Sequence, residues 1–167
     1  MGWKPEAPHC DSSLGIACTN MTDEIVQSTG RGTPRPFVLL WHGGGPVEDH
    51  LDWLCATDPS GNQPLQAWRM ELRLDTMEAG TETEAIELPP HRPRYLQFEG
   101  ELSGNRGSVR RIASGRAWSN PDTVDEEIFQ LEWLTGPATG RQQHVRLRRT
   151  SRQLWTLLCT HWKGEMP

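Results

Sequence analysis

Two histidines and an aspartate stand on either side of a glycine-rich turn and could together bind a metal ion. An apolar run, Phe37–His42, ends on a histidine, residues 43–49 include three consecutive glycines, and the next apolar run opens with a His-x-Asp pattern at His50 and Asp52. If both runs are strands of one hairpin, His50 and Asp52 share a face, and His42 can lie beside them. Two neutral imidazoles and a carboxylate are a ligand set for a divalent ion with open coordination positions. The spacing therefore predicts a metal site at this hairpin.

A second pair of candidate residues, His91 and Tyr95, lies in a proline-rich segment. The segment 89–94 contains three prolines and leads into a predicted strand. A rigid loop of this kind can hold an imidazole at a barrel mouth, where it could donate a proton or bind an anion. The residues alone leave open the alternative that His91 is an exposed loop residue and Tyr95 an aromatic at the barrel rim.

The remaining histidines and the second glycine-rich segment carry less chemistry. Residues 103–107 read Ser-Gly-Asn-Arg-Gly, which lacks the G-K-[ST] ending of a phosphate-binding loop and predicts a tight hairpin turn. His144 opens one predicted strand and His161 closes another, with no acidic residue at ligand spacing. We expect both histidines to be structural.

The elements that must position these side chains are short β-rich runs separated by turn residues. The runs are residues 37–42, 50–56, 65–74, 85–88, 95–102, 109–118, 128–134, 145–149 and 154–162. About nine short strands at this spacing, with little helix pattern, predict an all-β protein, a compact barrel of eight or nine strands or a sandwich. Most of the eight tryptophans lie within these runs, and we expect most of them to be in the core.

Charge is unevenly distributed along the chain, although the net charge of −5 argues against a general polyanion binder. Residues 105–153 contain nine arginines against five acidic residues. Arginine presents a planar fork that suits phosphate, so this half is compatible with a phosphate-bearing or nucleic-acid ligand. A solvated strand face of mixed charge explains the same pattern.

The 167 residues predict one barrel domain, residues 36–167, preceded by a flexible arm, residues 1–35, that is rich in structure breakers. The four cysteines show no metal-binding spacing, and the N-terminus lacks the apolar segment of a signal peptide. We expect a cytoplasmic monomer with free thiols.

Taken together, these segments resemble the 3′-phosphoesterase domain of bacterial DNA ligase D and its short stand-alone relatives. The resemblance runs from about residue 36 to residue 162. The segments that carry it are Phe37–His42, His50-Leu51-Asp52, Ala67-Trp68, His91 with Tyr95, Phe98-Glu99-Gly100, Gly104-x-x-Gly107-Ser108-Val109 and Gly115-x-x-Trp118. The order and spacing of these segments are more specific to the family than any single segment is.

The resemblance implies a compact β-barrel and a manganese-dependent DNA-repair enzyme that removes a 3′-phosphate or a terminal ribonucleoside from a DNA or RNA–DNA primer end. It assigns His42, His50 and Asp52 to the metal, and His91 and Tyr95 to the phosphate as catalytic and substrate-binding residues. A separate ATP-dependent DNA ligase or primase is the partner that it implies.

The chain departs from the family pattern at cationic positions. Leu54 replaces an arginine, Leu40 replaces a polar residue, and the lysine after the tryptophan strand has no clear equivalent, with Arg69 or Arg73 as substitutes. The turn between His42 and His50 is also two residues longer than usual. A barrel that binds nucleic acid or phosphate with impaired catalysis is therefore the alternative. A cupin-like metal oxidoreductase ranks last, because the paired cupin glycine motifs are absent.

Overall fold

The computed structural model describes residues 32–164, without the side chains of residues 121 and 122. The predicted arm falls mainly on residues 1–31 and lies outside the described residues. The strands are β1 (Arg35–Gly43), β2 (His50–Cys55), β3 (Leu65–Met70), β4 (Glu82–His91), β5 (Gly100–Glu101), β6 (Ser108–Thr123), β7 (Glu126–Thr135), β8 (Gln142–Arg149) and β9 (Leu154–Lys163). Two short 3-10 helices, η1 (Leu74–Thr76) and η2 (Pro93–Leu96), lie between strands.

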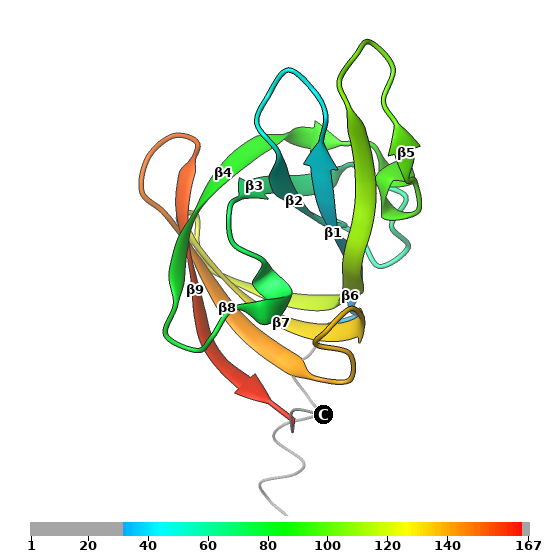
Figure 1. The fold of residues 1–167 in the computed structure, drawn as a ribbon. Coiled ribbons are helices and arrows are strands. Elements are labelled where there is room, and N and C mark those ends of the chain that lie inside the picture. Colours follow the sequence, from blue (N-terminus) through cyan, green and yellow to red (C-terminus); the bar gives the residue numbers. More distant parts are fainter. Residues whose placement is uncertain (1–31, 165–167) are drawn as a thin grey trace, which may run out of the picture. The chain divides into compact units, whose positions relative to one another are not determined.

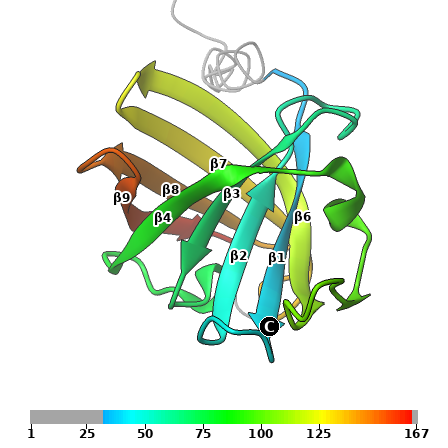
Figure 2. The ribbon, with the colours of Figure 1, turned by 90° about the horizontal axis from the view of Figure 1, so that it is seen from above.

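The strands form one antiparallel sheet that closes on itself (Figures 1 and 2). The order is β1-β2-β3-β4-β9-β8-β7-β6, and β6 pairs with β1 to complete an eight-stranded barrel, while β5 adds to β6. The described residues contain no α-helix, which confirms the predicted all-β barrel. Nor do they include any helix with the length and apolar character needed to cross a membrane.

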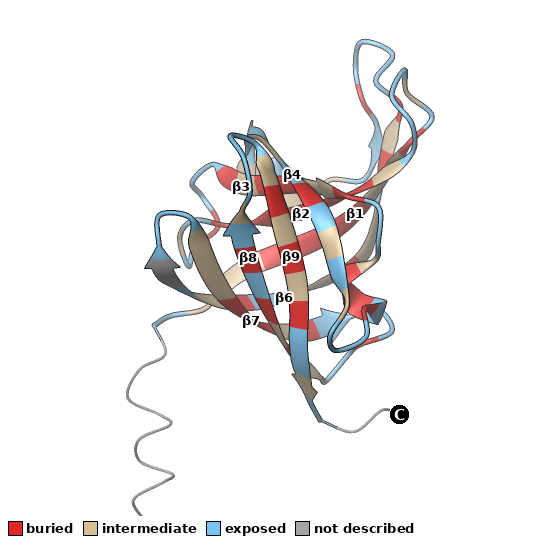
Figure 3. Ribbon diagram, turned by 90° about the vertical axis from the view of Figure 1, so that its left-hand side faces the viewer, coloured by how far each residue is buried: buried red, intermediate tan, exposed pale blue. Residues whose placement is uncertain are grey.

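The barrel interior is filled by alternate side chains from every long strand, seen as buried positions that alternate with exposed ones in Figure 3. Phe37 packs edge-on against Trp133, with ring centroids 4.9 Å apart, and Trp53 stacks on Trp68 at the same separation. Trp53, Trp68, Trp133 and Trp155 are buried. The core also buries Cys55, and this burial raises the pKa of its thiol to about 12.

A second apolar cluster lies on the outer face of β1, β2 and β3. Val38, Leu40, Leu54 and Ala67 alternate with the interior residues and therefore point outward. The segment that contains η2 and β5 packs against them, with Tyr95, Leu96, Phe98 and Leu102 as its contacts. This covering layer removes part of the outer sheet face from solvent, and the candidate site lies at its margin.

The predicted strand 65–74 is too long. β3 ends at Met70, and Leu74 begins η1, where it is fully buried in the interior core. Arg73 forms a two-point ion pair with buried Asp75, 2.7 Å at its shorter contact. The chain leaves the sheet here because Leu74 finds an apolar environment inside the barrel, which strand alternation alone does not reveal.

The predictions for residues 89–102 are also corrected. β4 continues to His91, through residues that were predicted to be a proline-rich loop. Pro89 and Pro90 are tolerated because the β3–β4 register shifts here, so that neither proline has a partner on β3 while the flanking Leu88 and His91 do. The predicted strand 95–102 is instead η2 followed by the two-residue β5. Pro93 explains the change, because a proline fits the first turn of a helix, where its missing N–H has no partner to lose.

Candidate metal centre

The hairpin of β1 and β2 brings the three predicted ligands together. His42 lies directly opposite His50, and Leu40 lies opposite Asp52. The two imidazole centroids are 4.7 Å apart, and one ligand atom from each of the three residues lies within 4.8 Å of the others. The predicted proximity of His42, His50 and Asp52 is therefore confirmed, and the cluster could hold a metal ion.

Backbone carbonyls orient both imidazoles. The Nε2–H of His42 donates to the Arg106 carbonyl at 2.8 Å, and the Nδ1–H of His50 donates to the Glu48 carbonyl at 2.6 Å. In a neutral imidazole the other nitrogen then carries a lone pair. Those nitrogens face the Asp52 carboxylate, His42 Nδ1 at 3.3 Å from Oδ2 and His50 Nε2 at 3.5 Å from Oδ1.

This arrangement fits a cation. Asp52 is 4% exposed, and neither its Oδ1 nor His50 Nε2 has a hydrogen-bond partner among the described residues. Two lone pairs turned toward a buried carboxylate repel it, and a divalent ion between them would satisfy all three groups. Nitrogen and oxygen donors of this kind suit several divalent ions, so the ligand set leaves the metal's identity open.

Two glycine-rich turns hold the Arg106 carbonyl against His42. Both turns rise from the same end of the barrel (Figures 1 and 3). A Cβ at Gly45 would lie 2.6 Å from the Arg106 carbonyl oxygen, and one at Gly107 would lie 2.2 Å from the Gly43 carbonyl oxygen. Gly107 also has a φ of +82°, which glycine adopts without strain. Glycine at these positions lets the turns approach closely enough for the hydrogen bond.

His91 and Tyr95 lie beside the cluster. They line a cavity of about 70 Å³ together with His42 and Asp52. Their ring centroids are 5.7 Å apart, and His91 Nδ1–H donates to the Pro89 carbonyl at 2.8 Å. The rest of the lining consists of Arg106 and four apolar residues, Leu40, Leu54, Leu102 and Val109. Leu40 and Leu54 therefore present apolar side chains to this cavity.

Two arginines line the adjoining space. Arg69 lies opposite Asp52 in the β2–β3 register. It lines a cavity of about 130 Å³ together with Arg106, His42 and His50. Arg73, the other suggested substitute, is instead paired with Asp75. Arg106 was missed because its turn indicated only a hairpin. The two glycine-rich turns were the available signal for Arg106, but they predict a close approach of one backbone to the other only once the two turns are known to be neighbours.

His144 and His161 pair with each other, in register across β8 and β9, with their ring centroids 4.0 Å apart in a stacked arrangement. Neither belongs to the metal cluster found among the described residues.

No protein-family model matches this chain, and a search of the curated proteins found no match. The geometry of the cluster therefore carries the functional argument.

Proposed function

We propose that this protein is a metal-dependent phosphoesterase that processes the 3′ ends of DNA or RNA–DNA primers in repair. The observation that supports it most is that the His42–His50–Asp52 cluster, His91, Tyr95 and Arg69 line two neighbouring cavities, which share His42 and Arg106 in their linings. Metal ligands, proton donors and a guanidinium are the groups that phosphoryl transfer needs.

The cluster would hold the ion, which the family resemblance suggests is Mn²⁺. When bound, a divalent ion supplies Lewis-acid polarisation of phosphoryl oxygens. Arg69 would bind the non-reacting phosphate oxygens through its guanidinium, and Arg106, whose Nε donates to the Ser103 carbonyl at 2.8 Å, would add a hydrogen bond from its remaining N–H groups. His91 gives its Nδ1–H to a carbonyl, so in its imidazolium form it would pass the Nε2 proton to the leaving oxygen and become the neutral imidazole, and the Tyr95 phenol would stabilise charge beside it.

The alternative is a barrel that binds a nucleic-acid or phosphate ligand but has impaired catalysis. The observation that favours it is the small cavity at His91, about 70 Å³, to which Leu40 and Leu54 present apolar side chains. A phosphate held at Arg69 could then fail to reach His91.

The test is to incubate the full chain with Mn²⁺ and a labelled primer that carries a 3′-phosphate. We expect loss of the phosphate by the wild type, with a rate reduced by about 100-fold or more in His91→Gln. His50→Ala should lose both the activity and the rise in melting temperature with Mn²⁺, whereas His161→Gln, a surface histidine on β9, should retain both.

Failure of the wild type to release phosphate or a terminal ribonucleoside would sink the phosphoesterase proposal. If Mn²⁺ and the primer nevertheless stabilise the protein, and Asp52→Ala abolishes the Mn²⁺ effect, the binding module is the better description. The cytoplasmic location, the monomeric state and cooperation with a separate ATP-dependent DNA ligase or primase are parts of the same proposal.

A further inference from the structure

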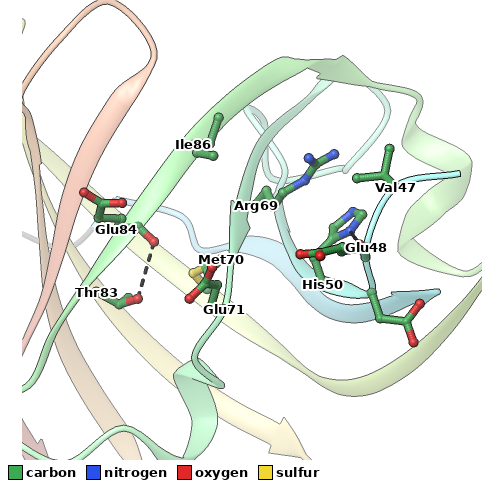
Figure 4. Close-up of a pocket in the computed structure, with 10 residues that line it drawn as sticks. Val47, Glu48, His50, Arg69, Met70, Glu71, Thr83, Glu84 and Ile86 are labelled. Atoms are coloured by element: carbon green, nitrogen blue, oxygen red, sulfur yellow. Dashed lines mark hydrogen bonds between the residues drawn. The ribbon is translucent and has the colours of Figure 1, made fainter. Parts of the chain in front are cut away.

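A groove of about 360 Å³ opens beside the metal cluster, on the outer face of β3 and β4 (Figure 4). His50 contributes to both the groove and the cluster. The turn residues Val47 and Glu48 form one side, Glu84 and Ile86 of β4 form the other, and Arg69 lies between them. A volume of this size matches a small organic ligand rather than a polymer.

The end of the groove nearest the cluster suits an anion. No ion pair involves Arg69 within the described part of the chain, and its Nε is buried without a hydrogen-bond partner there. His50, whose side chain is 7% exposed, lies at this end of the groove and turns its Nε2 toward Asp52 in the cluster. A guanidinium without a carboxylate partner beside a metal ligand is suited to phosphate.

The rest of the groove has the opposite charge. Four acidic side chains line it, namely Glu48, Asp49, Glu71 and Glu84. Carboxylates accept hydrogen bonds from hydroxyl and amino groups, but they repel a second phosphate within about 10 Å at moderate salt. Val47 and Ile86, which are 49% and 42% exposed, offer apolar surface for a ring.

We propose that this groove binds a single terminal nucleoside, with its 3′-phosphate at Arg69 and its sugar and base among the carboxylates and the two apolar side chains. The acidic rim of the groove, Glu48, Asp49, Glu71 and Glu84, then admits only the last nucleoside of a primer end and repels the phosphates that precede it, so a nucleoside 3′-monophosphate or a very short 3′-phosphorylated oligonucleotide binds at least as tightly as a long strand. This inference rests on the proposed function, because it takes the 3′-phosphate ester as the ligand.

The test measures binding rather than turnover. The probes are 3′-methylenephosphonate analogues, in which a P–C bond replaces the scissile P–O bond, of a nucleoside, a dinucleotide and a strand of about 12 nucleotides. Calorimetry in Mn²⁺ at low salt gives each dissociation constant for the wild type, Arg69→Gln and Glu71→Gln/Glu84→Gln. The matched control is Glu126→Gln/Glu132→Gln, which removes two acidic charges from β7, four strands from β3 around the barrel.

We expect the wild type to bind the nucleoside probe at least as tightly as the long strand, and Arg69→Gln to weaken nucleoside binding about tenfold or more. Glu71→Gln/Glu84→Gln should tighten binding of the long strand about three- to tenfold, change nucleoside binding less than about twofold, and lose its effect at high salt. The β7 control should leave the length preference unchanged.

Tighter binding of the long strand by the wild type, equal effects of the rim and β7 variants, or no binding of any probe would each overturn the inference. Its failure is separable from that of the proposed function. A protein that releases 3′-phosphate but prefers long strands keeps the function and loses the inference. A protein that binds the nucleoside probe as expected but releases no phosphate keeps the inference and loses the proposed function.

Discussion

At the scale of single residues, the metal cluster is defined by the direction of its lone pairs. As neutral imidazoles, His42 and His50 each give their one N–H to a backbone carbonyl, so neither ring donates a hydrogen bond to Asp52. A cation at the cluster would compensate the buried carboxylate. Asp52 differs in this from Asp75, equally buried, which is paired with Arg73.

The first prediction concerns Asp52→Asn. With the metal chelated at about pH 8, the asparagine N–H can donate to one imidazole nitrogen, so the variant should be as stable as the wild type or up to about 1 kcal/mol more stable. In Mn²⁺ at about 100 times its dissociation constant, the wild type should gain about 2.7 kcal/mol in its free energy of unfolding, and the variant should gain little. Urea unfolding with EDTA or Mn²⁺ measures both quantities.

The control is the same change at Asp75, which should reduce stability under both conditions because it breaks the contact with Arg73. A loss of more than about 2 kcal/mol by Asp52→Asn in EDTA would contradict the assigned tautomers.

At the scale of elements, two turns complete the site. His42 lies at the end of β1, next to the first turn, and the turn before β6 supplies the carbonyl that orients its ring. Because the backbone carbonyl of Arg106 makes this contact, the orientation of the His42 ring depends on the glycines that permit the approach and not on the Arg106 side chain.

The second prediction is that Gly107→Ala weakens Mn²⁺ binding about 10- to 100-fold, because the added methyl group displaces the turn and removes the hydrogen bond to His42. Calorimetric titration with Mn²⁺ measures the change. Gly104→Ala is the matched control: Gly104 has a φ of +77°, but nothing lies within 4 Å of its added Cβ. Equal losses in both variants would show that backbone strain, and not the close approach, is responsible.

Much of the arrangement of strands and turns can be predicted from the sequence. Turn residues separate the strands, and alternation places His50 and Asp52 on one face, as observed. Two features are not local. Leu74 leaves its strand because the interior offers an apolar site to a residue beyond Met70, and the Arg106 carbonyl meets His42 only because β6 closes on β1. Sequence spacing reports neither, whereas Pro93 was a readable signal that the run at Tyr95 begins as a helical turn.

At the scale of the whole molecule, the sheet separates two apolar clusters with different tasks. The interior cluster holds the barrel together. The outer cluster holds the segment with η2 and β5 over the face that carries Asp52. Side chains on opposite faces of one strand touch different clusters, so stability and metal binding should be separable by mutation.

The third prediction compares one leucine from each cluster. Leu74→Ala removes a fully buried interior side chain and should cost about 2–5 kcal/mol, while leaving the stabilisation by Mn²⁺ unchanged. Leu102→Ala, in the outer cluster beside the metal ligands, should reduce both. Urea unfolding with EDTA and with Mn²⁺ distinguishes the two effects, and an equal decrease of the Mn²⁺ increment in both variants would argue against separate tasks.

The hydrogen bond between His42 and the Arg106 carbonyl joins residues 64 positions apart, across the seam where β6 closes the barrel on β1. Pairings of such long range form late in folding, because the entropy of closing the loop must be overcome first. The three ligands of the ion lie on the β1–β2 hairpin, but the carbonyl that orients His42 reaches it only across this seam, so we expect an ion to bind at full affinity only after the barrel has closed. Such an ion would lengthen the lifetime of the folded barrel.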